Sequence, residues 1–300
     1  MKPYRSMLFV PGHRRGWAEK AASSGADALI LDLEDSVPAG QKNEARASVL
    51  DAVANLAAAE SPGPDLWVRP NSLESHEAGR DLEVVVCQGL TGVFLPKVYR
   101  RDDVISYAAL LTHFEVAQGL PVGSVQVMVS LETAESMVNC SDLARASERV
   151  AALVGTAVRD ADAARAVGYT FTPEGLETLY IRSRVVLESR AAGLEHPICG
   201  LWQDIGDLDG LRRFAEQNRG LGYRGQLVIH PSHVPVVNEV FGISASEISF
   251  YRGMIFAFDA AVAEGRAAVE YAGQHIDYAH VKTAREKLRL SDSAAEPTSH

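Results

Sequence analysis

Three acidic side chains follow directly after an apolar run near the N-terminus. Asp32, Glu34 and Asp35 come after the run Ala28–Leu31. A buried strand that ends in a loop has this pattern, because charged groups begin where the chain meets water or a cation. Carboxylates this close together repel one another, so a metal ion, a basic neighbour or open solvent must offset the repulsion. The pattern fits either a solvated acidic turn or one part of a binding site.

Charged residues also follow the later apolar runs of the chain. If these runs are parallel strands of one sheet, their carboxyl ends share an edge and the side chains meet around one mouth. A divalent cation such as Mg2+ binds one or two carboxylates, and an arginine beside it can bind a substrate carboxylate through two hydrogen bonds. Such a site stabilises an enolate, although each residue taken singly is more often a solvated loop residue or an ion pair. The charged run ends are Arg14, Asp32, Glu34, Asp35, Arg69, Lys97, Glu132, Asp160 and Asp162.

The apolar runs alternate with helical patterns along most of the chain. The alternation predicts the α/β class with a parallel sheet, and eight units of this length fit a closed (β/α)8 TIM barrel. The predicted strands are Met7–Val10, Ala28–Leu31, Leu66–Val68, Gly92–Leu95, Val125–Leu131, Val150–Val154, Ile198–Trp202 and Gln226–Ile229. The predicted helices between them include Lys42–Ala59, Arg80–Val86, Asp102–Gln118, Ala134–Ala146, Glu174–Ala192 and Leu208–Asn218.

An open, doubly wound sheet is the competing architecture. It needs a glycine-rich phosphate loop after its first strand, and Val10–Arg15 is not one. Gly220–Gly225 matches the dinucleotide-binding pattern G-x-G-x-x-G letter for letter. That motif needs a strand before it and a helix after it, whereas here a predicted helix comes first. We therefore interpret the segment as a helix-to-strand turn.

Composition excludes several classes of protein. The chain has 300 residues, of which 47% are hydrophobic, so it can bury a full core as one or two domains. Its formal net charge of −10 argues against a general nucleic-acid binder. Cys87, Cys140 and Cys199 lack the spacing of a zinc site or a disulfide framework, which favours the cytoplasm. We expect neither a signal peptide nor a membrane span.

Six short motifs carry a resemblance to a known family. They are Phe9-Val-Pro-Gly-His-Arg14, Leu31-Asp-Leu-Glu-Asp-Ser-Val37, Val68-Arg-Pro-Asn71, Leu95-Pro-Lys-Val98, Leu131-Glu-Thr133 and Ile229-His-Pro231. Their order resembles the HpcH/HpaI aldolase/citrate lyase superfamily, in particular its citrate lyase β-subunit-like branch. The resemblance implies a (β/α)8 barrel that uses Mg2+ to make or break a carbon–carbon bond. The expected substrate is a 3-hydroxyacyl-CoA thioester such as citryl-CoA or malyl-CoA, and the expected products are an acyl-CoA and a 2-oxo acid.

The resemblance also implies roles for single residues. Glu132 is the expected first metal carboxylate, and the second is expected in the loop after the sixth strand. Arg69 would hold the substrate carboxylate or the developing oxyanion as a catalytic residue. Asp277 would be a catalytic residue that a neighbouring subunit contributes. The expected substrate-binding set is Arg14, Glu34, Asp35, Arg69 and Lys97.

The sequence departs from the family pattern at three places. Counting back from Gly168 favours Asp162 as the second metal ligand, whereas distance from the sixth strand favours Asp160. Both therefore remain alternatives. Gln226 stands where the family often has lysine, and Cys199 stands where an aspartate is common. The last two differences can change the substrate or the acyl carrier.

Two other functions remain open at this point. One is a pyruvate-type class II aldolase that needs no coenzyme A. The aldolase branch characteristically has a histidine base near the second strand, whereas this chain has His13 after the first, which disfavours this alternative. The other is a non-catalytic or accessory subunit of a citrate lyase-like complex. His230 is a candidate acid or base, but a histidine at a strand end is more often structural.

Residues beyond 240 exceed the eight-unit barrel. We expect residues 1–240 to form the barrel, 241–290 to form a helical extension for subunit contact, and 291–300 to be disordered. The helical pattern Glu247–Glu264 presents apolar side chains that a neighbouring subunit would cover. We therefore expect a homo-oligomer, a trimer or a hexamer. Asp277 either reaches the neighbour's barrel or caps a helix that begins near Tyr278.

Overall fold

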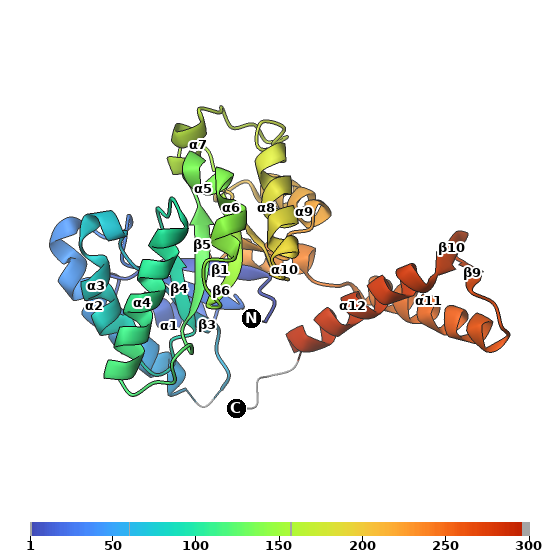
Figure 1. Ribbon diagram of the computed structural model, residues 1–300, viewed down its shortest axis with the longest axis horizontal. Coiled ribbons are helices and arrows are strands. Elements are labelled where there is room, and N and C mark those ends of the chain that lie inside the picture. The colour runs from blue at the N-terminus through green and yellow to red at the C-terminus, as the bar shows by residue number, and fades with distance from the viewer. Residues whose placement is uncertain (1, 60, 157, 296–300) are drawn as a thin grey trace. The chain divides into compact units, whose positions relative to one another are not determined.

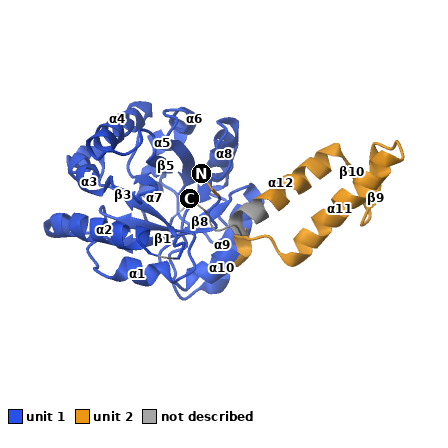
Figure 2. Ribbon diagram, turned by 90° about the horizontal axis from the view of Figure 1, so that it is seen from below, with its two compact units in different colours: residues 1, 3–238 blue, residues 2, 239–300 orange. Residues whose placement is uncertain are grey.

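The computed structural model describes residues 2–59, 61–156 and 158–295. It divides into two compact units, drawn in different colours in Figure 2. The first unit comprises Pro3–Asn238, and the second begins at Glu239. The boundary therefore lies close to residue 240, where the sequence predicted the end of the barrel.

The first unit is a closed barrel of eight parallel strands with helices around it (Figure 1). Each strand pairs with its neighbours in the sequence, and the last strand closes the barrel against the first. This topology confirms the predicted (β/α)8 architecture. The strands are β1 (Ser6–Pro11), β2 (Ala28–Asp32), β3 (Asp65–Arg69), β4 (Gly92–Leu95), β5 (Gln126–Leu131), β6 (Val150–Gly155), β7 (Ile198–Cys199) and β8 (Gly225–Val228).

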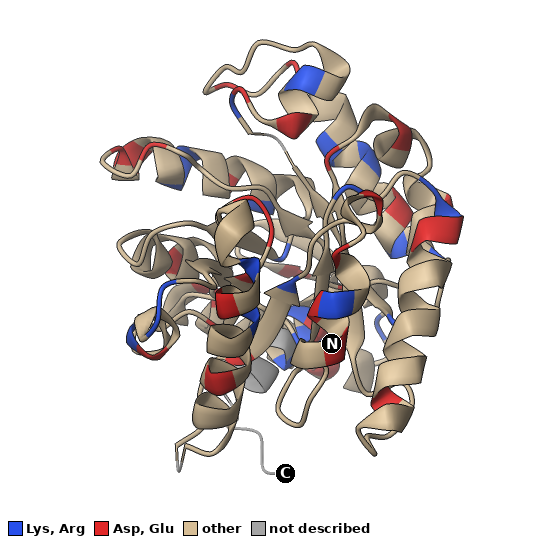
Figure 3. Ribbon diagram, turned by 90° about the vertical axis from the view of Figure 1, so that its left-hand side faces the viewer, with Lys and Arg blue, Asp and Glu red and all other residues tan. Residues whose placement is uncertain are grey.

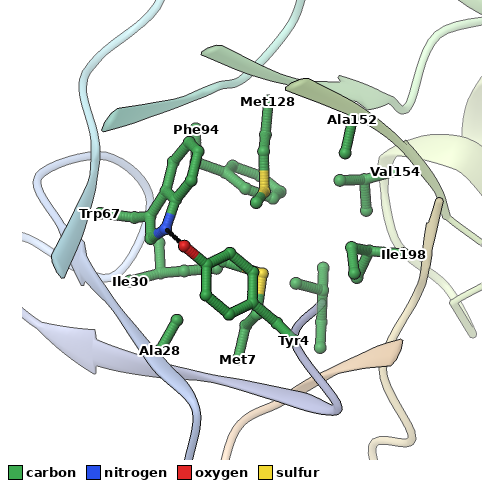
Figure 4. Packing of buried hydrophobic residues seen from close by; sticks show 11 residues of the cluster. Tyr4, Met7, Ala28, Ile30, Trp67, Phe94, Met128, Ala152, Val154 and Ile198 are labelled. Carbon is green, nitrogen blue, oxygen red and sulfur yellow. Dashed lines mark hydrogen bonds between the residues drawn. The ribbon is translucent and has the colours of Figure 1, made fainter. Parts of the chain in front are cut away.

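Alternate residues of each strand fill the inside of the barrel. Gly92 lies beside Trp67, and a β-carbon at this glycine would lie 2.4 Å from the indole ring, so the large ring requires glycine on the next strand. Farther along, the same alternation changes from apolar to charged residues, from Ile30 to Asp32 and from Trp67 to Arg69. The core inside the barrel is Tyr4, Met7, Ala28, Ile30, Trp67, Phe94, Met128, Ala152, Val154, Ile198 and Leu227 (Figure 4).

Ten helices and two short 3-10 helices of the described residues connect or follow the strands of the first unit. Helix α10 contains the boundary between the units. The helices are α1 (Trp17–Ala22), α2 (Lys42–Ala57), α3 (Ala78–Val85), α4 (Arg101–Ala117), α5 (Ala134–Val138), α6 (Cys140–Ala144), α7 (Asp162–Val167), α8 (Leu179–Ala191), α9 (Leu208–Leu221) and α10 (His233–Phe241). The 3-10 helices are η1 (Ala39–Gln41) and η2 (Leu73–Ser75).

Helix α9 shows why the glycine-rich segment is not a nucleotide loop. The side chain of Asp207 caps the start of α9 by accepting a hydrogen bond from the Gly210 amide at 2.8 Å. The helix ends at Leu221 and is capped by Gly222, whose φ of 111° belongs to the left-handed region that glycine adopts without strain. Strand β8 begins at Gly225. The helix-to-strand turn predicted for Gly220–Gly225 is therefore confirmed.

Two predicted helices differ from the structure. The helix predicted over 134–146 is interrupted at Asn139, which ends α5 and precedes α6. The helix predicted from Glu174 begins later, as α8. Before it, the Glu177 carboxylate accepts hydrogen bonds from the amide and the hydroxyl group of Thr172. This local turn competes with the helix for the same backbone.

The segments around β7 and β8 also contain corrections. The strand predicted to continue to Trp202 ends at Cys199. Trp202 instead packs against the rings of Phe171 and Phe214, with centroids 5.9 and 5.7 Å away. Helices α7 and α10 lie in segments where the sequence pattern predicted no helix.

The second unit consists of two helices and a small antiparallel hairpin. Its elements are α11 (Ala245–Ala263), β9 (Ala268–Tyr271), β10 (Gln274–Asp277) and α12 (Tyr278–Ala295). Its own apolar core contains Met254, Phe258, Ile276, Val281 and Ala284. Helix α12 reaches Ala295, so part of the tail predicted to be disordered is helical, and residues 296–300 lie outside the described residues. The predicted role in subunit contact stays a prediction.

Ion pairs and polar contacts hold the ends of the barrel where its strands begin. The Arg5 guanidinium bonds to Asp27 at 2.7 Å, just before β1 and β2. Before β6, Arg149 forms two hydrogen bonds with Glu115 of α4, at 2.7 and 2.5 Å. Burial alone would raise the pKa of Glu115, but Arg149 and the amides of Val125 and Gly123 lower it to about 2.

Charged residues of both signs are interspersed along the helices and loops (Figure 3). Among the described residues, no helix combines the length and apolar character that a membrane span requires.

Candidate active site

A pocket of about 320 Å³ opens where the strands of the barrel end. In (β/α)8 barrels this end carries the catalytic groups. Several lining residues continue the inward alternation of the core, so strand periodicity places them. The pocket is lined by Phe9, Pro11, Asp32, Asp35, Ser36, Arg69, Phe94, Ser130, Glu132, Thr156, Val158, Ala161, Asp162, Ala163, Gly200, Leu201, Leu227 and Ile229.

Arg69 is held in one orientation by its neighbours. Its Nε and Nη2 atoms each donate a hydrogen bond of 2.7 Å to Asp32, the residue that faces it across the β2–β3 pair. Nη1 lies 3.1 Å from Glu34 Oε2, and the guanidinium stacks over the Phe9 ring at 5.0 Å. A guanidinium has five N–H donors. At least two of them therefore remain for a ligand in the pocket.

The electrostatics keep this pair charged. Burial alone would lower the pKa of Arg69 and raise that of Asp32, but their hydrogen bonds and opposite charges together outweigh burial and shift both pKa values the opposite way. Asp32 therefore orients Arg69 and is not free to bind a cation by itself.

Lys97 neutralises the rest of the acidic cluster. Its ammonium group lies 2.7 Å from Glu34 Oε1 and 3.0 Å from Asp35 Oδ1. Burial raises the pKa of Glu34, and Arg69 and Lys97 only partly oppose this shift. Two basic neighbours, Arg69 and Lys97, therefore offset the repulsion among these carboxylates.

The backbone of Lys97 also positions Glu132. Lys97 has a φ of 47°, in the left-handed region that is uncommon for residues with a side chain. Its amide donates a hydrogen bond of 2.6 Å to Glu132 Oε1. The other oxygen, Oε2, accepts a long hydrogen bond of 3.4 Å from Ser130. One oxygen of Glu132 is thus fixed, and the other has only this long contact.

The carboxyl group of Glu132, which lines the pocket, has a strongly perturbed pKa. Burial raises the pKa of Glu132 to about 7, and the charges of Glu34 and Asp162 add to the effect against the Lys97 amide and Arg69. A carboxylate in such surroundings is stabilised in its charged form by a cation.

The sequence left open whether Asp160 or Asp162 is the second metal ligand. Asp162 lines the pocket together with Glu132, whereas exposed Asp160 does not. The Asp162 carboxylate also pairs with Arg165.

These residues fit a magnesium ion. Mg2+ is commonly held by one or two carboxylates and completes its shell with water and substrate oxygens. The described residues contain no group of three or more His, Cys, Asp or Glu side chains that could hold a metal ion. Glu132 and Asp162, whose charges interact across one pocket, provide the two-carboxylate arrangement instead.

Several predicted site residues lie outside this pocket. Glu34 and Lys97 contact the pocket residues but do not line it. Arg14 lines a separate, smaller pocket and its guanidinium lies 5.6 Å from the Trp17 ring. His230 is exposed and contacts the Ser232 hydroxyl at 2.7 Å. The substrate contacts expected of Arg14, Glu34 and Lys97 stay predictions.

Asp277 lies in the second unit and caps helix α12. Its Oδ1 accepts a hydrogen bond of 3.0 Å from the Ala279 amide and lies 2.6 Å from His280 Nδ1. These contacts lower the pKa of Asp277, with His280 as the main cause. Of the two roles that the sequence suggested, the cap is present within the chain, and the catalytic role in a neighbouring subunit stays a prediction.

Sequence reasoning missed the uncharged lining of the pocket. Phe9, Phe94, Ser130 and Thr156 line it, and none was singled out because attention went to charge. Phe9, Ser130 and Thr156 each lie two residues after an inward core residue, namely Met7, Met128 and Val154, and Phe94 is itself a core residue. The alternation of inward and outward side chains along each strand was the signal that could have identified them.

The chain belongs to the HpcH/HpaI aldolase/citrate lyase family, whose family model matches residues 5–231. The chain is 32% identical to the L-malyl-CoA/β-methylmalyl-CoA lyase of Cereibacter sphaeroides, over 97% of this chain and 95% of the relative. It is 30% identical to the (3S)-malyl-CoA thioesterase of the same species, over 98% and 96%.

A solved structure matches along nearly the whole chain as well. The protein CitE from Mycobacterium tuberculosis, in complex with magnesium, acetoacetate and coenzyme A, superposes with a TM-score of 0.75. The two chains are 27% identical, and the match covers 97% of this chain and 98% of the other.

Proposed function

We propose that this chain is a Mg2+-dependent carbon–carbon lyase that acts on a 3-hydroxyacyl-CoA thioester of the malyl-CoA or citryl-CoA type. Cleavage yields an acyl-CoA and a 2-oxo acid, and the reverse reaction condenses them. The observation that carries the proposal is the pocket in which Arg69, Glu132 and Asp162 meet. The membership of the family and the lyase among the relatives support this reaction class.

The metal would act as a Lewis acid, and the protein would supply its ligands and a hydrogen-bond donor for the substrate. When bound, Mg2+ supplies a Lewis acid that orients substrate oxygens and lowers the energy of developing negative charge. Glu132 and Asp162 are the residues that would hold it. Arg69, already oriented by Asp32, presents its remaining N–H donors to the oxygen on which the negative charge of the enolate develops.

The bond changes in this reaction are those of a retro-Claisen or retro-aldol cleavage. The hydroxyl group of the substrate loses its proton to a base, and its oxygen becomes the carbonyl oxygen of the 2-oxo acid. The electrons of the broken carbon–carbon bond form the thioester enolate, which then takes a proton to give the acyl-CoA. No cofactor redox change is needed, because the electrons stay within the two products.

One assay separates this function from its alternatives. The purified chain is incubated with Mg2+ and malyl-CoA or citryl-CoA, and the 2-oxo acid and free thiol are measured separately. A lyase releases 2-oxo acid without free thiol. Free thiol without 2-oxo acid would indicate thioester hydrolysis, as in the thioesterase relative. No turnover without other subunits would favour the accessory role, and cleavage of a free hydroxy-oxo acid would favour the aldolase.

We also propose that the active enzyme is a homo-oligomer in which Asp277 completes the site of a neighbouring chain. Inactive Glu132→Ala and inactive Asp277→Ala chains are co-assembled and assayed. A shared site pairs an intact barrel with an intact Asp277, so part of the activity should return. A mixture no more active than the separate variants would contradict a shared site and leave Asp277 as the cap of α12.

A further inference from the structure

Lys42 joins the two loops that follow β2 and β3. Its ammonium group donates hydrogen bonds of 2.6 Å to the Leu33 carbonyl, 2.7 Å to the Glu34 carbonyl and 2.7 Å to Asn71 Oδ1. An ammonium group has three N–H donors, so these three acceptors use all of them. Lys42 does not line the pocket. Its hydrogen bonds therefore reach the site through the backbone of one loop and a side chain of the other.

The loop after β2 connects Lys42 to the pair formed by Arg69 and Asp32. The Leu33 amide donates a hydrogen bond of 2.9 Å to the Arg69 carbonyl, and the Glu34 amide donates one of 2.9 Å to Asp32 Oδ1. The carbonyl groups of the same two loop residues accept the hydrogen bonds from Lys42. The amides of this short segment thus bond to the pair at the pocket, and its carbonyls bond to Lys42.

Asn71, the third acceptor, is itself fixed by buried groups. Its backbone amide and its Nδ2 donate hydrogen bonds of 2.6 and 2.7 Å to Asp81 Oδ2, and its carbonyl accepts one of 3.0 Å from the Tyr107 hydroxyl group. Asp81 and Tyr107 are buried residues of α3 and α4. On this side Lys42 is therefore bonded to a group that two helices already hold, two residues after Arg69.

The place of Lys42 in its own helix is locally unfavourable. It is the first residue of α2, and the dipole of a helix favours acidic rather than basic side chains at this end. Burial lowers the pKa of Lys42, against the charges of Asp32 and Asp81. Residues that depart from local preference are expected where a functional site requires them. The tertiary contacts of Lys42, and not its helix, therefore account for a lysine at this position.

The proposed metal ligands are held by other groups. Glu132 accepts its short hydrogen bond from the Lys97 amide, and Asp162 is the first residue of α7. The three donors of Lys42 are all used elsewhere. Loss of Lys42 should therefore disturb Arg69 more than the two metal carboxylates.

We propose that Lys42 is a positioning residue, which holds the loops after β2 and β3 so that Arg69 keeps the orientation in which it meets the substrate. Lys42 acts through Leu33, Glu34 and Asn71 and does not touch the substrate. The contact between Arg69 and the substrate rests on the proposed lyase function, whereas the orientation of Arg69 by Lys42 does not.

The first experiment measures the orientation of Arg69 without a ligand. The Nε–H group of Arg69, which donates to Asp32, is observed by NMR in the full chain and assigned by its loss in Arg69→Lys. Lys42→Met should raise the hydrogen-exchange rate of this group at least about fivefold, because the loops then open more often. Lys42→Gln, a polar substitute in case the methionine variant does not fold, should raise it at least about threefold.

Two controls separate positioning from a general loosening of the fold. The Nε–H group of Arg182, which donates to Thr178 at 3.1 Å in a buried contact of α8, is observed in the same spectrum and should exchange at an unchanged rate. Lys20→Met, at an exposed lysine of α1, should change neither group. Circular dichroism and melting temperature establish that each variant is folded. An unchanged exchange rate of Arg69 in a folded Lys42 variant would overturn the proposal, as would equal acceleration of both arginines.

The second experiment measures binding by calorimetric titration. Lys42→Met should weaken the binding of pyruvate, a small 2-oxo acid, to the Mg2+-loaded chain at least about tenfold, and should change Mg2+ affinity less than about twofold. Lys20→Met should change neither affinity. Equal losses of both affinities in Lys42→Met would contradict an action through Arg69.

A double-variant cycle tests whether Lys42 acts through Arg69. In an Arg69→Lys background, Lys42→Met should weaken pyruvate binding by less than about twofold further, because the effects of residues that act as one unit do not add. A further loss of about tenfold, as in the parent background, would show that Lys42 acts independently of Arg69 and would reject the proposal.

The two experiments distinguish failure of this inference from failure of the proposed function. If the Mg2+-loaded parent chain binds no pyruvate while Lys42→Met accelerates exchange at Arg69, the positioning role stands and the proposed function fails. If the parent chain binds pyruvate and folded Lys42→Met binds it equally well, the proposed function stands and the positioning role fails.

Discussion

The two ends of the barrel use the same residue types in different ways. Where the strands begin, two acids are each paired with one base, Asp27 with Arg5 and Glu115 with Arg149. Where the strands end, Arg69 contacts both Asp32 and Glu34 and leaves donors free. The first arrangement pairs each of these acids with its own arginine and stabilises the fold, whereas the second keeps hydrogen-bonding capacity for a ligand.

The pKa values of two glutamates express this difference. Hydrogen bonds lower the pKa of Glu115 to about 2, whereas burial and neighbouring acids raise that of Glu132 to about 7. A carboxylate that is satisfied by its own protein has a low pKa, and one that lacks a cation has a high pKa. Perturbed values of the second kind gather at functional sites. The comparison therefore assigns stability to one end of the barrel and chemistry to the other.

The largest effect should follow from breaking the buried pair at the strand starts. Arg149→Met leaves Glu115 buried without its cation and should lower the free energy of unfolding by about 3–5 kcal/mol. The kcat/KM of the molecules that stay folded should not change. Chemical denaturation measures the first quantity, and Glu115→Gln in the Arg149→Met background is the control that should recover part of the loss. A loss below about 1 kcal/mol would contradict a structural role for this pair.

The same pair predicts how stability changes with pH. The folded pKa of Glu115 lies below its ordinary value, so its contribution is present above about pH 4.5 and is lost as the pH falls toward about 2. The parent chain should lose stability through this range, and Arg149→Met should lose less. Denaturant titrations at a series of pH values measure both slopes.

At the opposite end, Glu132→Gln should remove a proposed metal carboxylate and keep the shape of the site. Lyase activity should fall on the order of 10²–10³-fold with unchanged thermal stability in the absence of metal. Since the pKa of Glu132 is raised to about 7, Mg2+ affinity of the parent chain should increase as the pH rises through 7, and this dependence should be weaker in the variant. Titration calorimetry with Mg2+ checks it. Full activity of the variant at low Mg2+ would show that Glu132 is not a ligand.

Arg69→Lys tests whether the forked geometry of the guanidinium matters. Lysine keeps the charge but cannot hold Asp32 through two parallel hydrogen bonds while binding a substrate oxygen. One charge-assisted hydrogen bond contributes about 2–3 kcal/mol, so kcat/KM should fall roughly 30- to 150-fold. A change below about threefold would place Arg69 outside the chemistry of the site.

The smallest effect should come from Asp160, the aspartate that does not line the pocket. Asp162 lines the pocket and Asp160 is exposed, so Asp160→Asn should change Mg2+ affinity less than about twofold, whereas Asp162→Asn should weaken it by at least about tenfold. The paired variants serve as controls for each other. Equal and mild effects of both would mean that neither aspartate binds the metal, which would undercut the two-carboxylate site.

The sequence allowed the barrel and the location of its active end to be predicted, but not the contacts within that end. Alternation of apolar runs and helices sufficed for the architecture, and charged run ends located Arg69, Glu132 and Asp162 at one pocket. The pairing of Arg69 with Asp32 depends on the register between β2 and β3, which no local pattern encodes. The left-handed backbone of Lys97 was equally hidden, because tertiary contacts impose it on an ordinary residue.

The inward alternation of the strands has a consequence for how this chain can evolve. Trp67 and Arg69 lie on the same face of β3, two residues apart. The same alternation of side chains therefore places one residue in the core and the other in the pocket. Inserting or deleting one residue within the strand would turn Arg69 outward and bring Val68 into the pocket. A change in the length of a loop outside the pocket leaves this alternation intact, whereas inside the strands only substitutions preserve it.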